Sequence, residues 1–231
     1  MNISMQNINF TSRSAEIRKA DKICRRINNI YPAFSPSKIM LKSIFKKDYD
    51  LYKYASSLQE IIDAKIRRPL HSLRELDLKY LYFKTLTDKT KEYKLANCNE
   101  FMNLANLACA VNGMKSVPIK FLAIDENDII KKDIDHIVLA VPLNGKKVEF
   151  DRLTRQKDVI IIDPWLGIAD YAQNIENRYK DFSDIFKLPE GIHLAADTHV
   201  KEEDIIPQKM FKNLREMFPE LIVDYSFTSK E

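Results

Sequence analysis

The sequence of 231 residues is poor in glycine, and this scarcity excludes several classes of protein. Its four glycines fall far below the usual share of ~7%, so collagen-like and glycine-rich architectures are disfavoured. Neither G-x-G-x-x-G nor G-x-x-x-x-G-K occurs, so the common nucleotide-binding signatures are absent. No run approaches the ~18 consecutive apolar residues of a membrane-spanning helix, and we expect no membrane span.

Cysteine and histidine are also scarce. The three cysteines Cys24, Cys98 and Cys109 are too few and too far apart in sequence for a disulfide scaffold or for a zinc site built on C-x-x-C pairs. This pattern favours a reducing, cytoplasmic-type compartment. Spacing of the H-E-x-x-H type does not occur either. We therefore expect a metal-free site, and no cofactor is implied.

The rest of the composition is typical of a folded protein, because 45% of the residues are hydrophobic. The beginning of the chain differs, since residues 1–12 carry no charge and are rich in Asn, Ser and Ile. We interpret residues 1–13 as a flexible terminus. Their composition also resembles the uncharged export segment of bacterial type III secretion substrates, which would make the protein a secreted effector that enters a host cell.

Charge is distributed unevenly along the chain. Residues 1–93 hold 19 Lys and Arg against 10 Asp and Glu, whereas residues 94–231 hold 18 against 23. A basic half can meet nucleic acid, an anionic membrane surface or an acidic protein. Its basic residues come as scattered pairs, and basic and aromatic residues are not interleaved in any known nucleic-acid-binding pattern, which favours an ordinary solvated helical surface and no specific nucleic-acid partner.

Hydrophobic periodicity predicts that residues 14–93 form a helical region. Apolar residues recur there at spacings of three and four, as on one face of an amphipathic helix. Ser35 followed by Pro36 is typical of a helix start, and Pro69 should end the helix before it. The expected helices cover residues 14–30, 35–45, 49–66 and 72–86, and the charged segment 87–94 is the expected boundary.

The pattern changes in residues 94–231, which we expect to form a catalytic core with C-terminal helices. Asn97 is a good helix cap and Gly113 a good helix stop. The Asn144-Gly145 pair is a hairpin signal. One helix followed by an antiparallel meander predicts an α+β fold. The expected helices cover residues 98–112, 169–186 and 205–218, and the expected strands cover residues 117–124, 136–143, 146–150 and 159–163.

Cys98 is the candidate nucleophile, because it lies at the start of the expected helix. The first N–H groups of a helix lack partners within the helix, and the helix dipole places positive potential there. Both features favour a thiolate, and the N–H groups can also donate to a developing oxyanion. Cys24 and Cys109 lie among apolar residues and are interpreted as small buried hydrophobic residues.

A nucleophilic cysteine needs a base and a group that orients the base. His136 opens one expected strand, and Asp163 ends another after a run of β-branched residues, where an unpaired charge would be costly. Asp163 would then hold one ring nitrogen of His136 and leave the other facing the sulfur. Asp151 is the rival orienter, but it opens a polar loop, so we favour Asp163.

The segments Asn97-Cys98-Asn99-Glu100-Phe101, Asp135-His136-Ile137-Val138 and Ile161-Ile162-Asp163-Pro164-Trp165 resemble the papain-like and transglutaminase-like cysteine hydrolases, in particular the compact bacterial effectors and toxins. The resemblance covers about residues 95–170. It implies a central helix packed on an antiparallel sheet, with Cys98, His136 and Asp163 as the catalytic residues. Two features depart from the family pattern: Asn99 replaces a frequent glycine, and the spacing between the His and the Asp is long.

Three further residues accompany this constellation. Asn97 is either a simple helix cap or a supporting residue of the site. Glu100 either caps the helix or forms a salt bridge with the basic half, or else it supports the site. Trp165 either forms a wall of the cleft or belongs to the core.

The resulting hypothesis is a cysteine-dependent hydrolase or acyl transferase, either a cysteine protease or a protein glutamine deamidase, that acts on an amide of a protein substrate. A host protein would be the substrate of an exported effector. The alternative is a non-catalytic interaction module on a degenerate papain-like scaffold.

Overall fold

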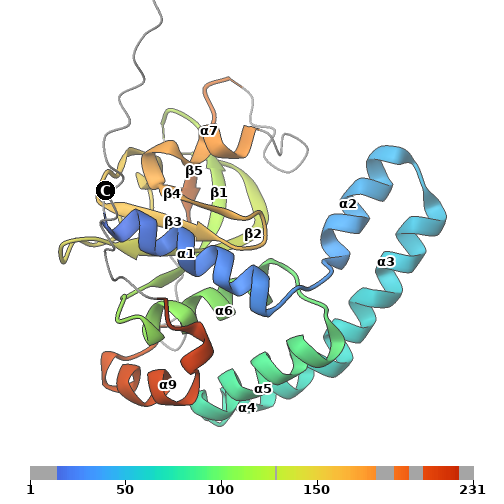
Figure 1. Ribbon diagram of the computed structural model, residues 1–231. Helices are drawn as coiled ribbons and strands as arrows, with labels where there is room; N and C mark the ends of the chain where they lie inside the picture. The colour runs from blue at the N-terminus through green and yellow to red at the C-terminus, as the bar shows by residue number, and fades with distance from the viewer. Residues whose placement is uncertain (1–14, 128, 181–189, 198–204, 224–231) are drawn as a thin grey trace, which may run out of the picture.

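The computed structural model describes residues 15–127, 129–180, 190–197 and 205–223 (Figure 1), and only the backbone of residues 131–135. The expected export segment, residues 1–13, lies outside these ranges. The described part combines helices with one antiparallel sheet, so the expected α+β class is confirmed. Its strands follow the order β4-β3-β2-β1-β5. They are β1 (Val117–Ile124), β2 (Ile130–Pro142), β3 (Val159–Asp163), β4 (Ile168–Tyr171) and β5 (His193–Ala196).

Helices precede, cover and follow the sheet. The expectation of helix throughout residues 14–93 is largely confirmed, and a single helix separates this region from the first strand. The helices are α1 (Ala15–Ile30), α2 (Pro36–Lys46), α3 (Tyr49–Ile61), a π-helical segment (Ile62–Arg67), α4 (Arg68–Glu75), α5 (Lys79–Tyr93), α6 (Cys98–Val111), α7 (Ile175–Tyr179) and α9 (Phe211–Met217).

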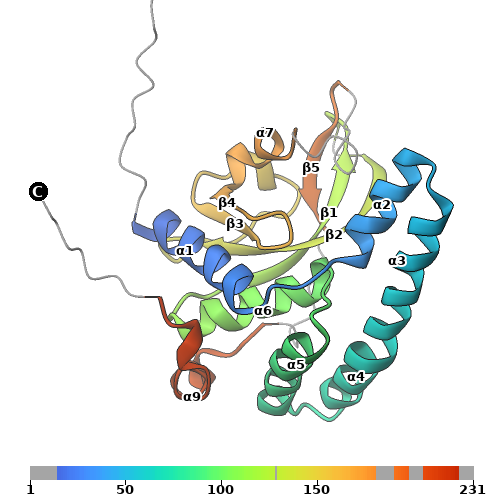
Figure 2. The same ribbon diagram turned by 45° about the vertical axis from the view of Figure 1, so that its right-hand side comes forward.

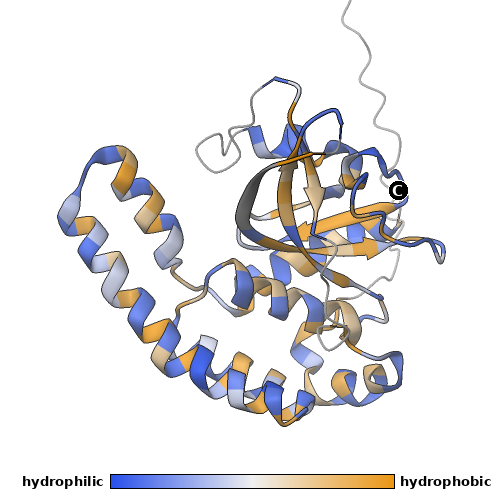
Figure 3. Cartoon of the chain, turned by 180° about the vertical axis from the view of Figure 1, so that it is seen from behind, coloured by the Kyte–Doolittle hydropathy of each residue, from blue (hydrophilic) through white to orange (hydrophobic). Residues whose placement is uncertain are grey.

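The sheet separates two apolar cores. Side chains alternate along a strand, so in β3 Ile160 and Ile162 face one core while Val159 and Ile161 face the other. Helices α1 and α6 pack on the first face, and Figure 3 shows hydrophobic residues along these strands and α6. The second face is covered from the side of α7.

Helix α1 belongs to the packing of the sheet. It contacts α6, β3 and β4, and its apolar stripe is fully buried in the first core. Helices α2 and α3 instead form an antiparallel pair, here called the arm (residues 36–61), which extends away from the sheet (Figures 1 and 2). The division at residue 93 therefore separates a helical region from a region of helices and strands, but the first core contains residues from both regions.

The expected ends of the helices at 49–66 and 72–86 are wrong, and so is the expected boundary at 87–94, because α5 continues to Tyr93. Helical structure continues through Pro69, because the preceding turn is π-helical and Arg68 N–H bonds to the Asp63 carbonyl. Pro69 then occupies the first turn of α4, where its missing N–H is tolerated. The break comes later, between α4 and α5, where Asp77 adopts a left-handed φ of 51°.

The expected hairpin forms its turn but not its second strand. Asn144 and Gly145 have φ values of 52° and 71°, and Lys146 N–H donates to the Leu143 carbonyl at 2.9 Å. Residues 146–150 form no strand, because β3 takes the edge of β2 that they would need. The side chain of Gln156 instead bonds the loop backbone at Lys147 and Glu149.

The elements near the C-terminus also differ from expectation. Residues 169–171 belong to strand β4 and not to a helix, since their backbone pairs with β3. Helix α7 follows, and residues 181–186 of the expected helix lie outside the described residues. The last expected helix is confirmed only in part, because 3₁₀ turns flank a shorter α9.

Candidate active site

Cys98 is the first residue of α6, as expected, with Asn97 as the N-cap. The Glu100 carboxylate accepts from the Asn97 N–H at 3.0 Å, which fixes the first turn. The Cys98 side chain is half-buried. Cys98 therefore lies at the N-terminal end of a helix, where the helix dipole is positive.

The side chain of Asn97 ties this helix start to the arm. Its carboxamide oxygen accepts from the hydroxyls of Ser35 at 2.9 Å and Ser37 at 2.8 Å. Its NH₂ group donates to Gln59 of α3 at 2.6 Å. Asn97 is thus both the cap that the sequence predicted and a link between two elements.

Glu100 is anchored from the opposite direction. It is buried, with 1% of its side chain exposed, and Arg67 donates to it from Nε at 2.9 Å. Arg67 belongs to the π-helical segment. The expectation that Glu100 caps the helix or pairs with the basic half is confirmed, because it does both.

His136 and Asp163 form a buried pair. His136 Nε2 lies 2.8 Å from Asp163 Oδ2, and each side chain is 1% exposed. The register sets Leu139 opposite Ile162, so His136 and Asp163 are diagonal neighbours on one face of adjacent strands. The contact expected from the sequence is present.

Asp163 accepts two further hydrogen bonds. The Leu166 N–H donates to Oδ1 at 3.1 Å, and the Tyr179 hydroxyl donates to Oδ2 at 3.1 Å. Burial and the charge of Asp163 raise the pKa of Tyr179, so the phenol stays a donor. Asp151, by contrast, is exposed and lies 3.8 Å from Arg152; it does not hold His136.

The pKa of His136 is raised to about 9. Burial alone would lower this pKa, because it disfavours the charged imidazolium. The charge of Asp163, its hydrogen bond and smaller contributions from Cys98, at the start of α6, act in the opposite direction, and together they outweigh the effect of burial.

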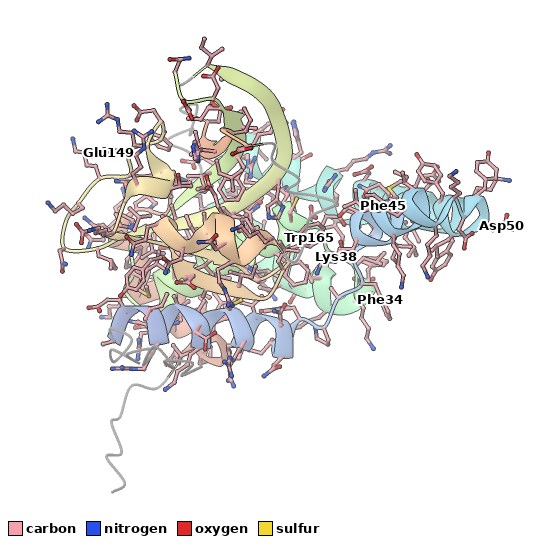
Figure 4. The ribbon with its side chains drawn as sticks, turned by 90° about the horizontal axis from the view of Figure 1, so that it is seen from above. Phe34, Lys38, Phe45, Asp50, Glu149 and Trp165 are labelled. Atoms are coloured by element: carbon pink, nitrogen blue, oxygen red, sulfur yellow. The ribbon has the colours of Figure 1, made fainter. Side chains whose placement is uncertain are left out.

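Trp165 lies between His136 and the base of the arm. Its ring centroid is 4.9 Å from that of His136, and its indole N–H donates to Ser35 Oγ at 2.6 Å. Lys38 Nζ lies 4.9 Å from the indole centroid and donates to the Trp165 carbonyl. Figure 4 shows Trp165 and Lys38 side by side, with Phe34 nearby. Trp165 is buried and packs both in the core and against the site.

The other cysteines are buried, as expected. Burial raises the pKa of both thiols, to about 12 for Cys109. Cys24 donates to the carbonyls of Asp163 and Ile168 at 3.8 and 3.7 Å. These thiols stay protonated at neutral pH and are poor nucleophiles.

Several neighbours of the site had no signal in the sequence. Tyr179, Lys38 and Arg67 come from helices without a motif, and only the fold brings them to Asp163, Trp165 and Glu100. Within the described ranges, no group of three or more His, Cys, Asp or Glu side chains is arranged to hold a metal ion.

Comparison with protein-family models, curated proteins and solved structures found no match.

Proposed function

We propose that the protein is a cysteine-dependent hydrolase or acyl transferase that acts on an amide of a protein substrate. One observation carries the proposal: Asp163 holds Nε2 of the buried His136, and Cys98, the first residue of a helix, contributes to raising the pKa of that histidine. This combination of nucleophile, base and orienting carboxylate is what acyl transfer by a thiol requires.

The reaction would follow from these groups. His136 accepts the thiol proton at Nδ1, and the Cys98 sulfur attacks the amide carbonyl carbon. The oxyanion of the tetrahedral intermediate accepts from N–H groups at the start of α6. As the C–N bond breaks, His136 gives its proton to the leaving amine, and a thioester remains. Water then opens the thioester, with His136 again as the base.

The amide that is attacked and the acceptor that opens the thioester together decide the outcome. A backbone amide gives proteolysis, a glutamine side chain gives a glutamate and ammonia, and an amine in place of water gives transglutamination. All three outcomes use the same three groups, so each is compatible with the site.

The proposal includes a papain-like or transglutaminase-like core. In support, α6 carries Cys98 at its N-terminus and packs on the antiparallel sheet. The His and the Asp follow on neighbouring strands, in that order along the chain. A host protein remains the proposed substrate of an exported effector.

Thiol reactivity tests the proposal. The full-length protein is treated briefly with iodoacetamide near neutral pH, and each cysteine is quantified by peptide mass spectrometry. We expect Cys98 to react at least about tenfold faster than the same cysteine in the urea-unfolded chain, because a thiolate is the nucleophile. His136→Ala should abolish this advantage. Buried Cys24 and Cys109 serve as internal controls.

Equal reactivity of Cys98 in the folded and unfolded chain would refute the enzyme and favour a non-catalytic module. If Cys98 is activated, a general protein such as casein is incubated with the protein and followed for new peptides and for released ammonia. Cys98→Ala should remove whichever product appears, whereas Cys109→Ala should retain it. The two products distinguish protease from deamidase.

A further inference from the structure

The turn between α2 and α3 exposes large apolar side chains. We call Ile44, Phe45 and Tyr49 the tip patch; they are 59%, 54% and 68% exposed. They lie within six consecutive positions of the chain, and every residue from 44 to 50 is exposed. Single exposed hydrophobic residues are ordinary, but a cluster of this kind indicates an interaction site.

The turn itself is well defined. Lys47 ends α2 in the left-handed region, and its N–H bonds to the carbonyls of Ile44 and Ser43. Asp48 then caps α3 by accepting from the Leu51 N–H at 2.9 Å. Both helix ends are therefore satisfied, and the tip patch is held at the end of a structured arm (Figures 1 and 2).

Neither apolar core nor the proposed active site uses these side chains; within the arm, Lys53 Nζ lies 4.5 Å from the centroid of the Tyr49 ring. Within the arm, the buried positions are Pro36, Ser43 and Ala55, so the patch contributes nothing to a core. Figure 4 places Phe45 farther along α2 than Lys38, and Asp50 at the far end of the arm from Trp165.

The charged residues around the tip patch indicate what binds to it. Four exposed lysines surround the patch, against the carboxylates of Asp48 and Asp50, and Asp48 is engaged as a cap. The patch lies at the free end of the arm (Figures 1 and 2), where it can meet an extended surface. Long lysine side chains can keep their ammonium groups at lipid phosphates while apolar neighbours enter the acyl boundary. The lysines are Lys42, Lys46, Lys47 and Lys53.

We propose that the tip of the arm docks peripherally on an anionic membrane surface. The unequal charge of the two halves would orient the chain, because residues 1–93 are basic and residues 94–231 acidic. The docking is superficial: in the described part of the chain, no helix has the length and apolar character needed to cross a bilayer.

Vesicle sedimentation tests this proposal on the full-length protein. We expect co-sedimentation with phosphatidylcholine–phosphatidylserine vesicles at physiological ionic strength and little with phosphatidylcholine alone. Phe45→Glu should weaken partitioning by about tenfold or more, through loss of apolar burial. Lys46→Gln and Lys47→Gln should each weaken it about fivefold, and added salt should weaken it further.

Leu76→Glu is the matched control, because Leu76 is 68% exposed at a different site, and it should leave partitioning unchanged. Far-UV circular dichroism checks that each variant is folded. Absence of binding to the anionic vesicles, or binding that Phe45→Glu and Leu76→Glu affect equally, would overturn the proposal. A concentration-dependent dimer that Phe45→Glu dissociates, without vesicle binding, would assign the patch to a second copy of the chain.

Discussion

Asp163 serves three donors at once, and this explains how a carboxylate can stay in the interior. An imidazole, a phenol and a backbone N–H surround it, which offsets the cost of removing a charge from water. The cluster also fixes which nitrogen of His136 is occupied. Nε2 faces the carboxylate, so the proposed reaction would use Nδ1.

The His136–Asp163 pair predicts a pH dependence of stability. The folded pKa of about 9 lies above the usual 6.5, so the stabilisation is complete below pH 6.5 and is lost as pH rises through about 9. The difference between these values, at about 1.4 kcal/mol per pH unit, corresponds to about 3 kcal/mol. In Asp163→Asn, burial depresses the pKa of His136 because the carboxylate is absent. No loss of stability is therefore expected between pH 6.5 and about 9.

Urea unfolding of both proteins, followed by circular dichroism between about pH 6 and pH 10, measures this difference. The free energies of unfolding should converge as pH rises from 6.5 to 9. Parallel curves would show that Asp163 does not raise the pKa of His136.

At the level of elements, the start of α6 depends on its neighbours as much as on its own sequence. Asn97 is fixed by the arm and Glu100 by the π-helical segment. A movement of either neighbour would change the position of Cys98. This makes Arg67 a residue that acts on the site through Glu100 without touching the proposed reacting atoms.

Arg67→Met should therefore destabilise the protein by about 2 kcal/mol, because it leaves the buried Glu100 charge without its partner. Thermal or urea unfolding measures the loss. Arg68→Met, at the exposed neighbouring arginine, should have little effect. Adding Glu100→Gln to Arg67→Met should recover part of the loss, and failure to do so would show that the arginine stabilises by packing alone.

The sequence predicted those elements whose signals are local. Ser35 and Asn97 cap the helices expected of them, and the strands at 117–124 and 159–163 have the expected limits. The His136–Asp163 contact was also accessible, because it follows from strand adjacency and side-chain alternation. The continuation of the helix through Pro69 could not be predicted from the sequence, because a π-helical turn has no clear local pattern.

Competition between segments accounts for the other differences. Residues 146–150 have the composition of a strand, but β3 is the segment that pairs with β2. Residues 169–171 match a helical pattern, yet they pair with the edge of β3 and form part of strand β4. Tyr179 reaches Asp163 only after the chain has turned back over the sheet. Such outcomes depend on tertiary contacts that a local pattern does not contain.

At the scale of the whole molecule, the first core joins both halves of the chain. Helix α1 supplies Ile17, Ile23 and Ile27 to a core that also contains α6 and the sheet. A fragment of residues 94–231 would lose this cover and expose the apolar face of β3 and β4. We therefore expect the fragment not to fold on its own, although it contains Cys98, His136 and Asp163.

Near-UV circular dichroism and the cooperativity of thermal unfolding measure this for the fragment and the full chain. The fragment should lack a cooperative transition. Adding a peptide of residues 15–33 should restore part of it, because the missing contacts are mostly those of α1. A cooperative transition in the fragment alone would instead establish it as an independent domain.

Trp165 is the only tryptophan of the chain, and its position makes its intrinsic fluorescence a probe of the site. The indole contacts the imidazole of His136 on one side, and on the other it contacts Ser35, just before the arm, and Lys38 of the arm. Emission excited at the tryptophan band therefore comes from the junction of arm and site alone. A fluorescence emission spectrum recorded while the arm is bound to vesicles would show, without an added label, whether the surroundings of Trp165 become exposed to water.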